Sequence, residues 1–195
     1  MMKDTITQCI NDSIETKKTV RDQLAGEIEN SARIMIEALN SGNKVLICGN
    51  GGSAADAQHF AAELMVRFET ERDALPAVAL HCDSSNVTAC GNDYGYDKVF
   101  ERAVSGLGRT GDVLVAISTS GNSPNVMLAV DKAKSLGMKV IGLLGKDGGK
   151  MRGQNLDSAL IVPSKTTARI QESHIMIIHI WCKLIDQHVN ASKKS

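Results

Sequence analysis

The sequence is poor in aromatic residues and has no surplus of charge of either sign. Only 3% of its 195 residues are Phe, Trp or Tyr, and 22 Lys and Arg are matched by 22 Asp and Glu. Proteins that neutralise nucleic-acid phosphates need a basic face, and those that stack single-stranded bases need aromatic platforms. The composition therefore argues against a nucleic-acid partner, whereas a hydrophobic fraction of 43% is typical of a folded globular protein.

Long apolar runs and paired cysteines are also missing. No run approaches the roughly 20 apolar residues of a membrane span, and the polar opening residues do not resemble a secretory signal. The five cysteines are scattered and include no C-x-x-C pair, so neither a zinc knuckle nor a disulfide framework is indicated. We expect a cytoplasmic protein with reduced thiols and no membrane partner.

Short apolar runs alternate with helical stretches along the chain. The runs are continuously apolar, as in strands covered on both faces, and predict strands at 44–48, 77–80, 112–117, 139–144 and 158–163. Helical spacing predicts helices at 53–67, 84–105, 123–136 and 167–189, and two more within 4–40 that are separated near Gly26. The alternation predicts an α/β fold, with a mostly parallel sheet between two layers of helices.

The domain organisation follows from the same pattern. No internal repeat or linker divides the chain, so we expect one domain over 1–195. It would consist of an N-terminal helical extension over 1–43, an α/β core over 44–189 and a polar tail over 190–195. Ligands of such folds bind beyond the carboxyl ends of the strands, so the loops that follow the strands are the candidate sites.

A glycine-rich loop follows the first predicted strand. It consists of Gly49, Asn50, Gly51, Gly52 and Ser53. Glycines let the backbone approach a ligand, and the helix that begins here offers free N–H groups to an anion. A tight turn without a ligand is one alternative. A dinucleotide site is another, with Gly49, Gly51 and Ala54 in a G-x-G-x-x-A pattern and Asp83 as the ribose acceptor.

A hydroxyl-rich loop follows the third predicted strand. Its hydroxyl groups belong to Ser118, Thr119, Ser120 and Ser123. A single helix N-cap needs one hydroxyl, whereas four hydroxyls together with helix-terminal amides can surround a phosphate without a formal charge. Two anion-binding loops on neighbouring strands favour a small phosphorylated molecule over a dinucleotide.

Two predicted helices carry residues that could do acid–base chemistry. His59 and Glu63 are four residues apart, so they share a helix face and could form a base or half of a divalent metal site, or an ordinary surface pair. On the last helix, His179 is the one strongly polar side chain between Ile175 and Cys182. We therefore expect that stretch to be buried nearly all round and its imidazole to have a partner, with a backbone carbonyl as one alternative.

Three further polar residues are candidates for contacts with a ligand. Gln171 precedes His179 by two turns, or ~12 Å of helix, so the spacing alone leaves open whether both serve one site. Asn92 and Asp93 follow the second strand and could bind a sugar, although Asn and Asp are also common in turns.

Five stretches of the sequence together resemble the sugar isomerase (SIS) superfamily and, within it, the phosphoheptose isomerase family. They are CGNGGSAADAQHFAAEL, GNDYG, AISTSGNSPN, GMKVIGLLGKDGGKM and RIQESHIMIIHI, and the resemblance covers essentially the whole chain. It implies a three-layer sandwich around a five-stranded parallel sheet of flavodoxin-like type. It also implies a homotetramer that has its active sites at subunit interfaces.

The resemblance also implies an activity. The family converts sedoheptulose 7-phosphate, by aldose–ketose isomerisation through an enediol, to D-glycero-D-manno-heptose 7-phosphate for the ADP-heptose and lipopolysaccharide core pathway. Glu63 would be the base and His179 its acid–base partner. The family's divalent metal, commonly zinc, would be bound by His59, Glu63, Gln171 and His179, and no nucleotide cofactor is implied. Contacts with the sugar phosphate are implied for Asn50, Gly51, Gly52, Ser53, Glu63, Asn92, Asp93, Ser118, Thr119, Ser120, Ser123 and Gln171.

One relative in the same superfamily is not an enzyme. It binds the bacterial replication initiator and shares a stretch like the RFETER at 67–72. A binding module needs neither a carboxylate at 63 nor an imidazole at 179. This chain has both, which favours the enzyme.

Overall fold

One five-stranded parallel sheet forms the centre of the molecule. The computed structural model describes residues 1–192, with side chains through Val189. The strands are β1 (Val45–Cys48), β2 (Ala77–Ala79), β3 (Val113–Ser118), β4 (Lys139–Gly145) and β5 (Ser158–Val162), and their order in the sheet is β2-β1-β3-β4-β5. In that order the chain reverses direction across the sheet between β1 and β3, which is the flavodoxin-like arrangement. The predicted fold class and all five predicted strands are confirmed.

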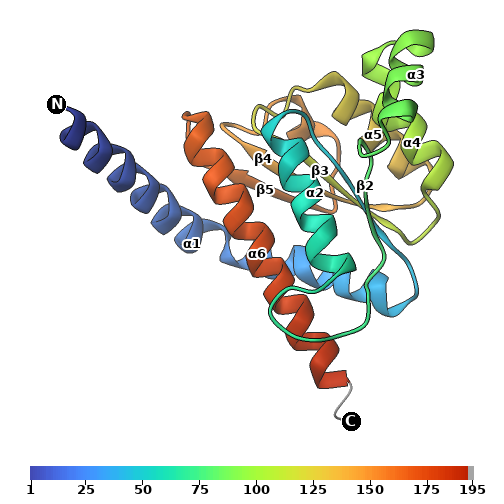
Figure 1. Ribbon diagram of the computed structural model, residues 1–195, viewed down its shortest axis with the longest axis horizontal. Coiled ribbons are helices and arrows are strands. Elements are labelled where there is room, and N and C mark those ends of the chain that lie inside the picture. Colours follow the sequence, from blue (N-terminus) through green and yellow to red (C-terminus); the bar gives the residue numbers. More distant parts are fainter. Residues whose placement is uncertain (193–195) are drawn as a thin grey trace.

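Helices cover both faces of the sheet (Figure 1). They are α1 (Met2–Asn40), α2 (Gly52–Met65), α3 (Ser84–Tyr94), α4 (Val99–Leu107), α5 (Pro124–Ser135) and α6 (Thr167–Ser192), with short 3₁₀ turns at η1 (Tyr96–Lys98) and η2 (Lys150–Gly153). Because side chains alternate along a strand, Val45 and Ile47 point to one layer and Leu46 and Cys48 to the other. The first layer contains α1, α2 and α6, and the second contains α3, α4 and α5.

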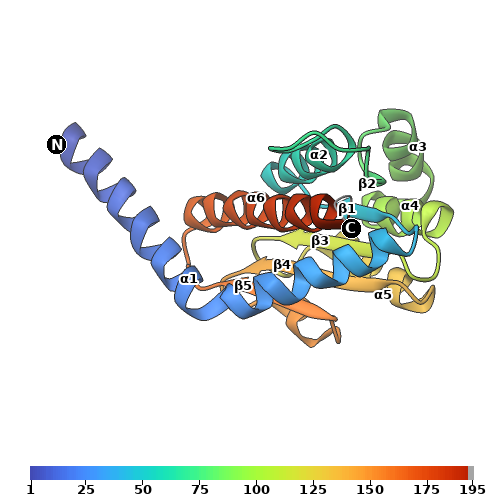
Figure 2. The same ribbon diagram turned by 90° about the horizontal axis from the view of Figure 1, so that it is seen from below.

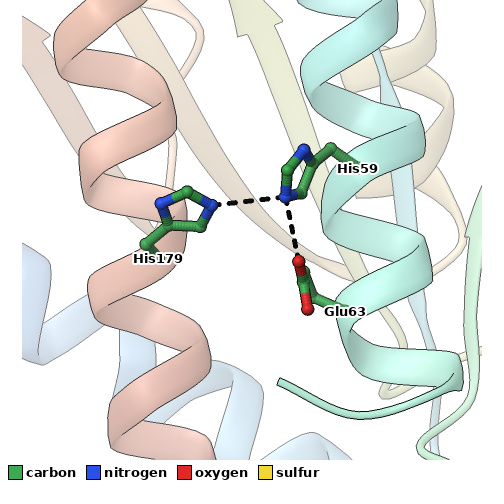
Figure 3. A group of neighbouring side chains, drawn as sticks. All are labelled: His59, Glu63 and His179. Carbon is green, nitrogen blue, oxygen red and sulfur yellow. Dashed lines mark hydrogen bonds and ion pairs between the residues drawn. The ribbon is translucent and has the colours of Figure 1, made fainter. Parts of the chain in front are cut away.

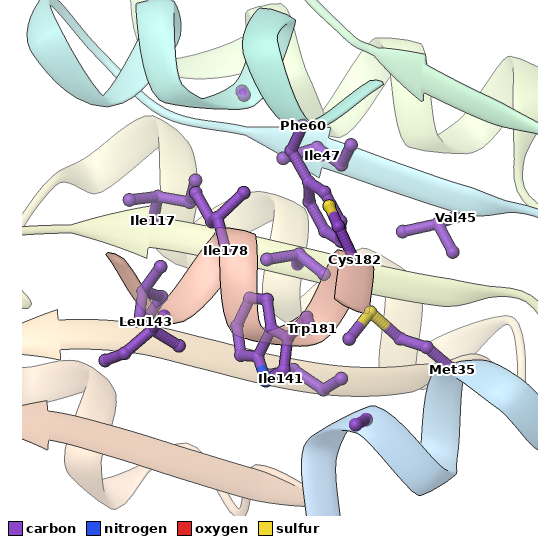
Figure 4. Close-up of a cluster of buried hydrophobic side chains, with 14 of the residues drawn as sticks. Met35, Val45, Ile47, Phe60, Ile117, Ile141, Leu143, Ile178, Trp181 and Cys182 are labelled. Carbon is purple, nitrogen blue, oxygen red and sulfur yellow. The ribbon is translucent and has the colours of Figure 1, made fainter. Parts of the chain in front are cut away.

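The larger core lies between α6 and the sheet (Figure 4). Trp181 is fully buried there, with its ring 5.7 Å from that of Phe60 on α2. Its indole Nε1 donates to Ser31 Oγ on α1 at 2.8 Å, so the polar atom of this buried ring is satisfied. One side chain thus packs α6 against both neighbouring helices.

Two helix predictions were wrong, each because of a glycine. Residues 2–40 form one continuous helix, because Gly26 is exposed on it and lowers its stability by about 1 kcal/mol relative to Ala without ending it. The single helix predicted over 84–105 is instead divided at Gly95, whose φ of +86° stops α3. The backbone then passes through η1 into α4.

The N-terminal part of α1 extends away from the rest of the domain (Figures 1 and 2). Ile6, Ile10 and Ile14 lie on it with exposed fractions of 45–59%. Arg169 of α6 connects to this arm by donating to the Cys9 carbonyl at 2.8 Å. The tail predicted over 190–195 lies partly outside the described residues, and α6 includes its first three positions. No helix among the described residues is long and apolar enough to cross a membrane.

The prediction that α6 is buried nearly all round from Ile175 to Cys182 was also wrong. Ile177, Ile178 and Trp181 are buried against the sheet, but Ile180 is 37% exposed. Ile175 and Met176 are half-buried. The helix packs on the sheet, α1 and α2, and these neighbours leave one apolar side of it uncovered among the described residues.

Candidate active site

The glycine-rich and hydroxyl-rich loops lie side by side beyond the carboxyl ends of β1 and β3. These strands are hydrogen-bonded neighbours, with Cys48 opposite Ala116. A pair of amides joins the loops: Asn50 Nδ2 donates to Asn125 Oδ1 at 2.8 Å, and Asn125 Nδ2 donates back to Asn50 Oδ1 at 2.9 Å. Asn125 is only 2% exposed, so the first turn of α5 holds the glycine-rich loop in place.

The hydroxyl-rich loop is ordered by its own polar groups. Ser118 Oγ and Ser123 Oγ lie 3.0 Å apart, and Ser118 Oγ accepts from the Gly121 amide at 3.1 Å. Ser123 precedes α5, yet its hydroxyl caps no backbone amide of that helix among the described residues. Because Ser123 is not used as a side-chain cap, the loop hydroxyls remain suited to an anion, whereas Pro124 has no amide hydrogen and the Val126 and Met127 amides donate to Asn125 Oδ1 and the Ser123 carbonyl.

A third loop, over 145–149, packs under the hydroxyl-rich loop together with the start of η2. The Met151 amide donates to the Gly121 carbonyl at 3.0 Å, and the Lys150 amide donates to Asn122 Oδ1 at 3.0 Å. The loop after β4 therefore supports the loop after β3, which makes the candidate phosphate site a preformed cradle.

His59, Glu63 and His179 form a cluster between α2 and α6 (Figure 3). His59 Nε2 lies 2.9 Å from Glu63 Oε1 and 3.3 Å from His179 Nε2. The side chain of Glu63 is 23% exposed and that of His59 is 46% exposed, so the cluster is open to a ligand. Phe68 stacks on the other side of the His179 ring, with centroids 5.6 Å apart.

The cluster fits a divalent cation. Two imidazole nitrogens and one carboxylate oxygen lie within 4.8 Å of one another, and these are donor types that zinc takes in catalytic sites with an open position. The two ring nitrogens that face each other can share at most one proton, whereas a cation could accept a lone pair from both.

Gln171, in the first turns of α6, places its side chain against Gly52 at the start of α2. Its side-chain amide fills the space that a side chain at position 52 would need, so a larger residue there would have to displace Gln171. This places Gln171 beside the glycine-rich loop, where it can contact a substrate. Its predicted role as a metal ligand stays a prediction.

Comparison with known proteins decides the family. The SIS domain family matches residues 8–145. A phosphoheptose isomerase from Nitratiruptor sp. is 56% identical over 173 residues, which cover 89% of this chain and 92% of the relative. The chain belongs to the phosphoheptose isomerase family of SIS-domain proteins.

Solved structures of the family agree with this assignment. A phosphoheptose isomerase from Neisseria gonorrhoeae matches with a TM-score of 0.91 at 47% identity, covering 96% of this chain and 100% of that one. One from Francisella tularensis matches with a TM-score of 0.93 at 43% identity, covering 96% and 99%. The long N-terminal helix and the five-stranded sheet are therefore features that the chain shares with its family.

The structure gathers most, but not all, of the predicted site residues in this phosphoheptose isomerase fold. Asn92 and Asp93 lie on the exposed end of α3, where Asn92 Nδ2 donates to Asp93 Oδ1 at 2.8 Å. No hydrogen bond among the described residues joins them to the two loops. Their segment reaches the site through Tyr96 instead, whose hydroxyl donates to Asn50 Oδ1 at 3.1 Å.

Sequence reasoning missed three residues of this region. Asn125 and Tyr96 hold Asn50, and the third, Asp56, lies one helical turn before His59. Burial raises the pKa of Asp56 to about 6, and the nearby His59 opposes this shift. A clue to Asp56 was available, because residues three apart share a helix face. Nothing local indicated that Asn125 would pair with a residue 75 positions earlier.

Proposed function

We propose that the chain is an isomerase that converts sedoheptulose 7-phosphate to D-glycero-D-manno-heptose 7-phosphate, in the route to ADP-heptose and the lipopolysaccharide core. The observation that carries the proposal is the Glu63–His59–His179 cluster on α2 and α6, because α2 begins at the glycine-rich loop that is joined to the hydroxyl-rich loop. The names of the family members support the substrate. An isomerase needs such a pairing, since one end of the site must hold a remote phosphate while the other moves protons.

The hydroxyl-rich loop would bind the phosphate. Ser118, Thr119, Ser120 and Ser123 would donate to its oxygens. Asn50, Gly51, Gly52 and Ser53 would contact the sugar chain, with Gln171 on the opposite side of the glycine-rich loop. The backbone of this loop can approach the sugar closely because no side chain projects from Gly51 or Gly52. We also propose sugar contacts for Asn92 and Asp93.

Glu63 and His179 would move the protons. In the ketose, C1 carries hydrogens next to the C2 carbonyl, which makes them acidic. Glu63 would take one of these protons to give the enediol, exchange it with water at the open cluster and deliver a proton to C2, which yields the aldose. His179 would donate a proton to the C2 oxygen and accept one from the C1 oxygen, so that the substrate carries no lasting charge. The open face of the cluster leaves room for both carbons.

His59, Glu63 and His179 would hold the family's divalent ion, together with Gln171 from two turns earlier in α6. Zinc is an ion that these donor types suit. When bound, such an ion supplies positive charge that stabilises negative charge on the substrate oxygens. Holding the ion would also fix the orientation of both imidazole rings. No nucleotide cofactor is required for this reaction.

We propose that the chain forms a homotetramer in the cytoplasm, with its active sites at subunit interfaces. The exposed isoleucines of the α1 arm and the uncovered apolar side of α6 support this, because monomers rarely leave such stripes open to water. A groove lined by Phe68, Met176, His179 and Ile180 runs along that side of α6 and reaches the cluster. A second subunit that covers this groove would complete the site.

Turnover followed by NMR tests the proposal. Sedoheptulose 7-phosphate is incubated with the purified protein, and the anomeric region is monitored for the aldose product. Conversion supports the isomerase. No conversion with added zinc, together with a stable complex with a replication initiator, would favour the non-enzymatic alternative instead.

A further inference from the structure

The segment after α2 is fastened to α6 by a buried ion pair. Arg72 Nε lies 2.8 Å from Asp186 Oδ1, and the two side chains are only 1% and 4% exposed. The residues are 114 positions apart in sequence. Removing two charges from water is costly, and a buried pair often adds no more stability than apolar residues of the same size. A pair of this kind therefore calls for an explanation other than stability.

Arg72 also binds the end of α2, besides the Asp73 carbonyl. Its guanidinium donates to the Glu63 carbonyl at 2.7 Å and to the Leu64 carbonyl at 2.8 Å. These carbonyls belong to the last turns of the helix, which have no amide partners within it. Arg72 thus binds the backbone of the very residue whose carboxylate lies in the cluster.

Asp186 occupies the same side of α6 as His179. The two residues are seven positions apart, which brings them within about 20° of each other around the helix. Besides Arg72, Asp186 accepts from the Glu69 and Thr70 amides at 3.2 Å and from Thr70 Oγ1 at 3.0 Å. Although burial alone would raise it, these bonds lower the pKa of Asp186, so the carboxylate stays charged.

The segment between these anchors contacts the cluster directly. Phe68 precedes the two amides that bind Asp186, and its ring stacks on His179. One ion pair is therefore connected to Glu63 through its carbonyl and to His179 through both Phe68 and α6.

We propose that Arg72 and Asp186 are positioning residues that hold α2 and α6 at the separation where Glu63 and His179 can share a cation and act on one substrate. The catalytic part of this inference rests on the proposed function. The geometric part does not, because the arrangement of the two imidazoles can be measured in metal-free protein.

A second ion pair, with a buried carboxylate, provides a matched control. Lys44 Nζ lies 2.6 Å from Asp112 Oδ2, whose side chain is 2% exposed. Asp112 precedes β3 and also accepts from the Lys44 and Arg109 amides, at the amino ends of β1 and β3, whereas the candidate loops follow the carboxyl ends. Its neutralisation removes a comparable network without touching either helix of the cluster.

The experiment compares Asp186→Asn with Asp112→Asn. Cobalt(II) replaces zinc as a coloured probe, and its visible absorption reports both affinity and ligand geometry. We expect Asp186→Asn to raise the Kd for cobalt about 10- to 100-fold, the usual effect of losing a group that orients metal ligands, and to change the spectrum. Its kcat should fall more than its KM changes. Asp112→Asn should leave the Kd, the spectrum and kcat within about twofold, and Asp186→Glu should restore part of the loss.

Unchanged cobalt affinity, spectrum and kcat in Asp186→Asn would overturn the inference, and so would equal losses in Asp112→Asn. If Asp186→Asn does not fold, Arg72→Lys replaces it, since lysine keeps the charge but cannot reach both Asp186 and the Glu63 carbonyl. In metal-free protein, NMR signals of the His59 and His179 rings should shift in these variants and not in Asp112→Asn. Absence of turnover in the unsubstituted protein would refute the proposed function, while the ring shifts would still decide the positioning role.

Discussion

On α6, two histidines five residues apart meet opposite environments. His174 faces the sheet, is 0% exposed and donates through Nε2 to the Leu144 carbonyl at 2.9 Å. Burial lowers the pKa of His174 to about 4, so its ring is neutral at physiological pH. His179 faces α2, is half-buried and meets His59 and Phe68.

The difference shows that one helix can carry a purely structural histidine on one side and a histidine of the candidate site on another. The side toward the sheet gives its histidine a single carbonyl partner and no access to water, so that ring can neither exchange protons nor bind a ligand. The side toward α2 leaves its histidine among groups that can do both. A polar residue on an apolar helix therefore indicates a functional site only when the groups that it faces in the folded protein are also known.

The first prediction separates the two sides by activity. His179→Gln should lower kcat about 10³-fold, within the range for loss of a general acid–base group, and leave the fold unchanged. His174→Gln, which can still donate to the Leu144 carbonyl, should keep turnover within about threefold. Turnover measured by NMR and folding measured by circular dichroism test both variants. Full activity in His179→Gln would remove this residue from the mechanism.

The second prediction concerns the metal. Dialysis against a chelator should lower turnover about 100-fold, because a cation that stabilises charge on substrate oxygens contributes several kcal/mol to the barrier. Added zinc should restore it. The protein should stay folded because the cores are built elsewhere, but its melting temperature should fall, since an ion that binds only the folded state stabilises it. Turnover that is unaffected in protein shown to be metal-free would limit the cluster to acid–base chemistry.

The third prediction concerns His174, on the side of α6 that faces the sheet, and the pH dependence of the free energy of unfolding. In the unfolded chain His174 has an ordinary pKa near 6.5, so between about pH 6.5 and 4 the unfolded state binds the extra proton. Stability therefore falls as the pH falls through this window and is unaffected above it. From pH 7 to pH 5 the contribution is about 2 kcal/mol.

Urea unfolding of His174→Gln at both pH values measures this term. The loss of stability between pH 7 and pH 5 should be smaller than in the unsubstituted protein by about that amount. The same loss in both proteins would show that His174 is not the group responsible. His179→Gln serves as the control on the other side of α6.

The smallest expected effect tests how the loops are held. Asn125→Ala removes the buried amide that holds Asn50, and a neutral hydrogen bond is worth about 1 kcal/mol, so KM should rise about fivefold with a smaller change in kcat. Tyr96→Phe removes one bond to the same Asn50 oxygen and leaves the amide pair, so its KM should rise less than threefold. An unchanged KM in Asn125→Ala would show that Asn50 needs no such support.

The sheet and the loops could be predicted because their signals are local. Each strand is a continuous apolar run, and each loop that follows it shows its glycines or hydroxyls in sequence. The helices were harder to predict, since whether a glycine ends a helix depends on its backbone conformation. Gly26 stays helical, whereas Gly95 takes a positive φ.

The cluster itself could be predicted only through the family resemblance. His59 and Glu63 are close in sequence, but His179 is 120 positions from His59, and the packing of α6 on α2 brings them together. The same is true of Arg72 and Asp186, whose pairing no local pattern indicated. Long-range packing, rather than residue type, decides which polar side chains share a site.

Turnover of sedoheptulose 7-phosphate in D₂O by the unsubstituted protein and by Glu63→Gln tests the central claim most directly. The unsubstituted protein should form the aldose and place solvent deuterium on the carbon that receives the proton. Glu63→Gln should fold, bind the substrate and show neither conversion nor deuterium uptake. Turnover by Glu63→Gln within tenfold of the unsubstituted protein would contradict the assignment of Glu63 as the base.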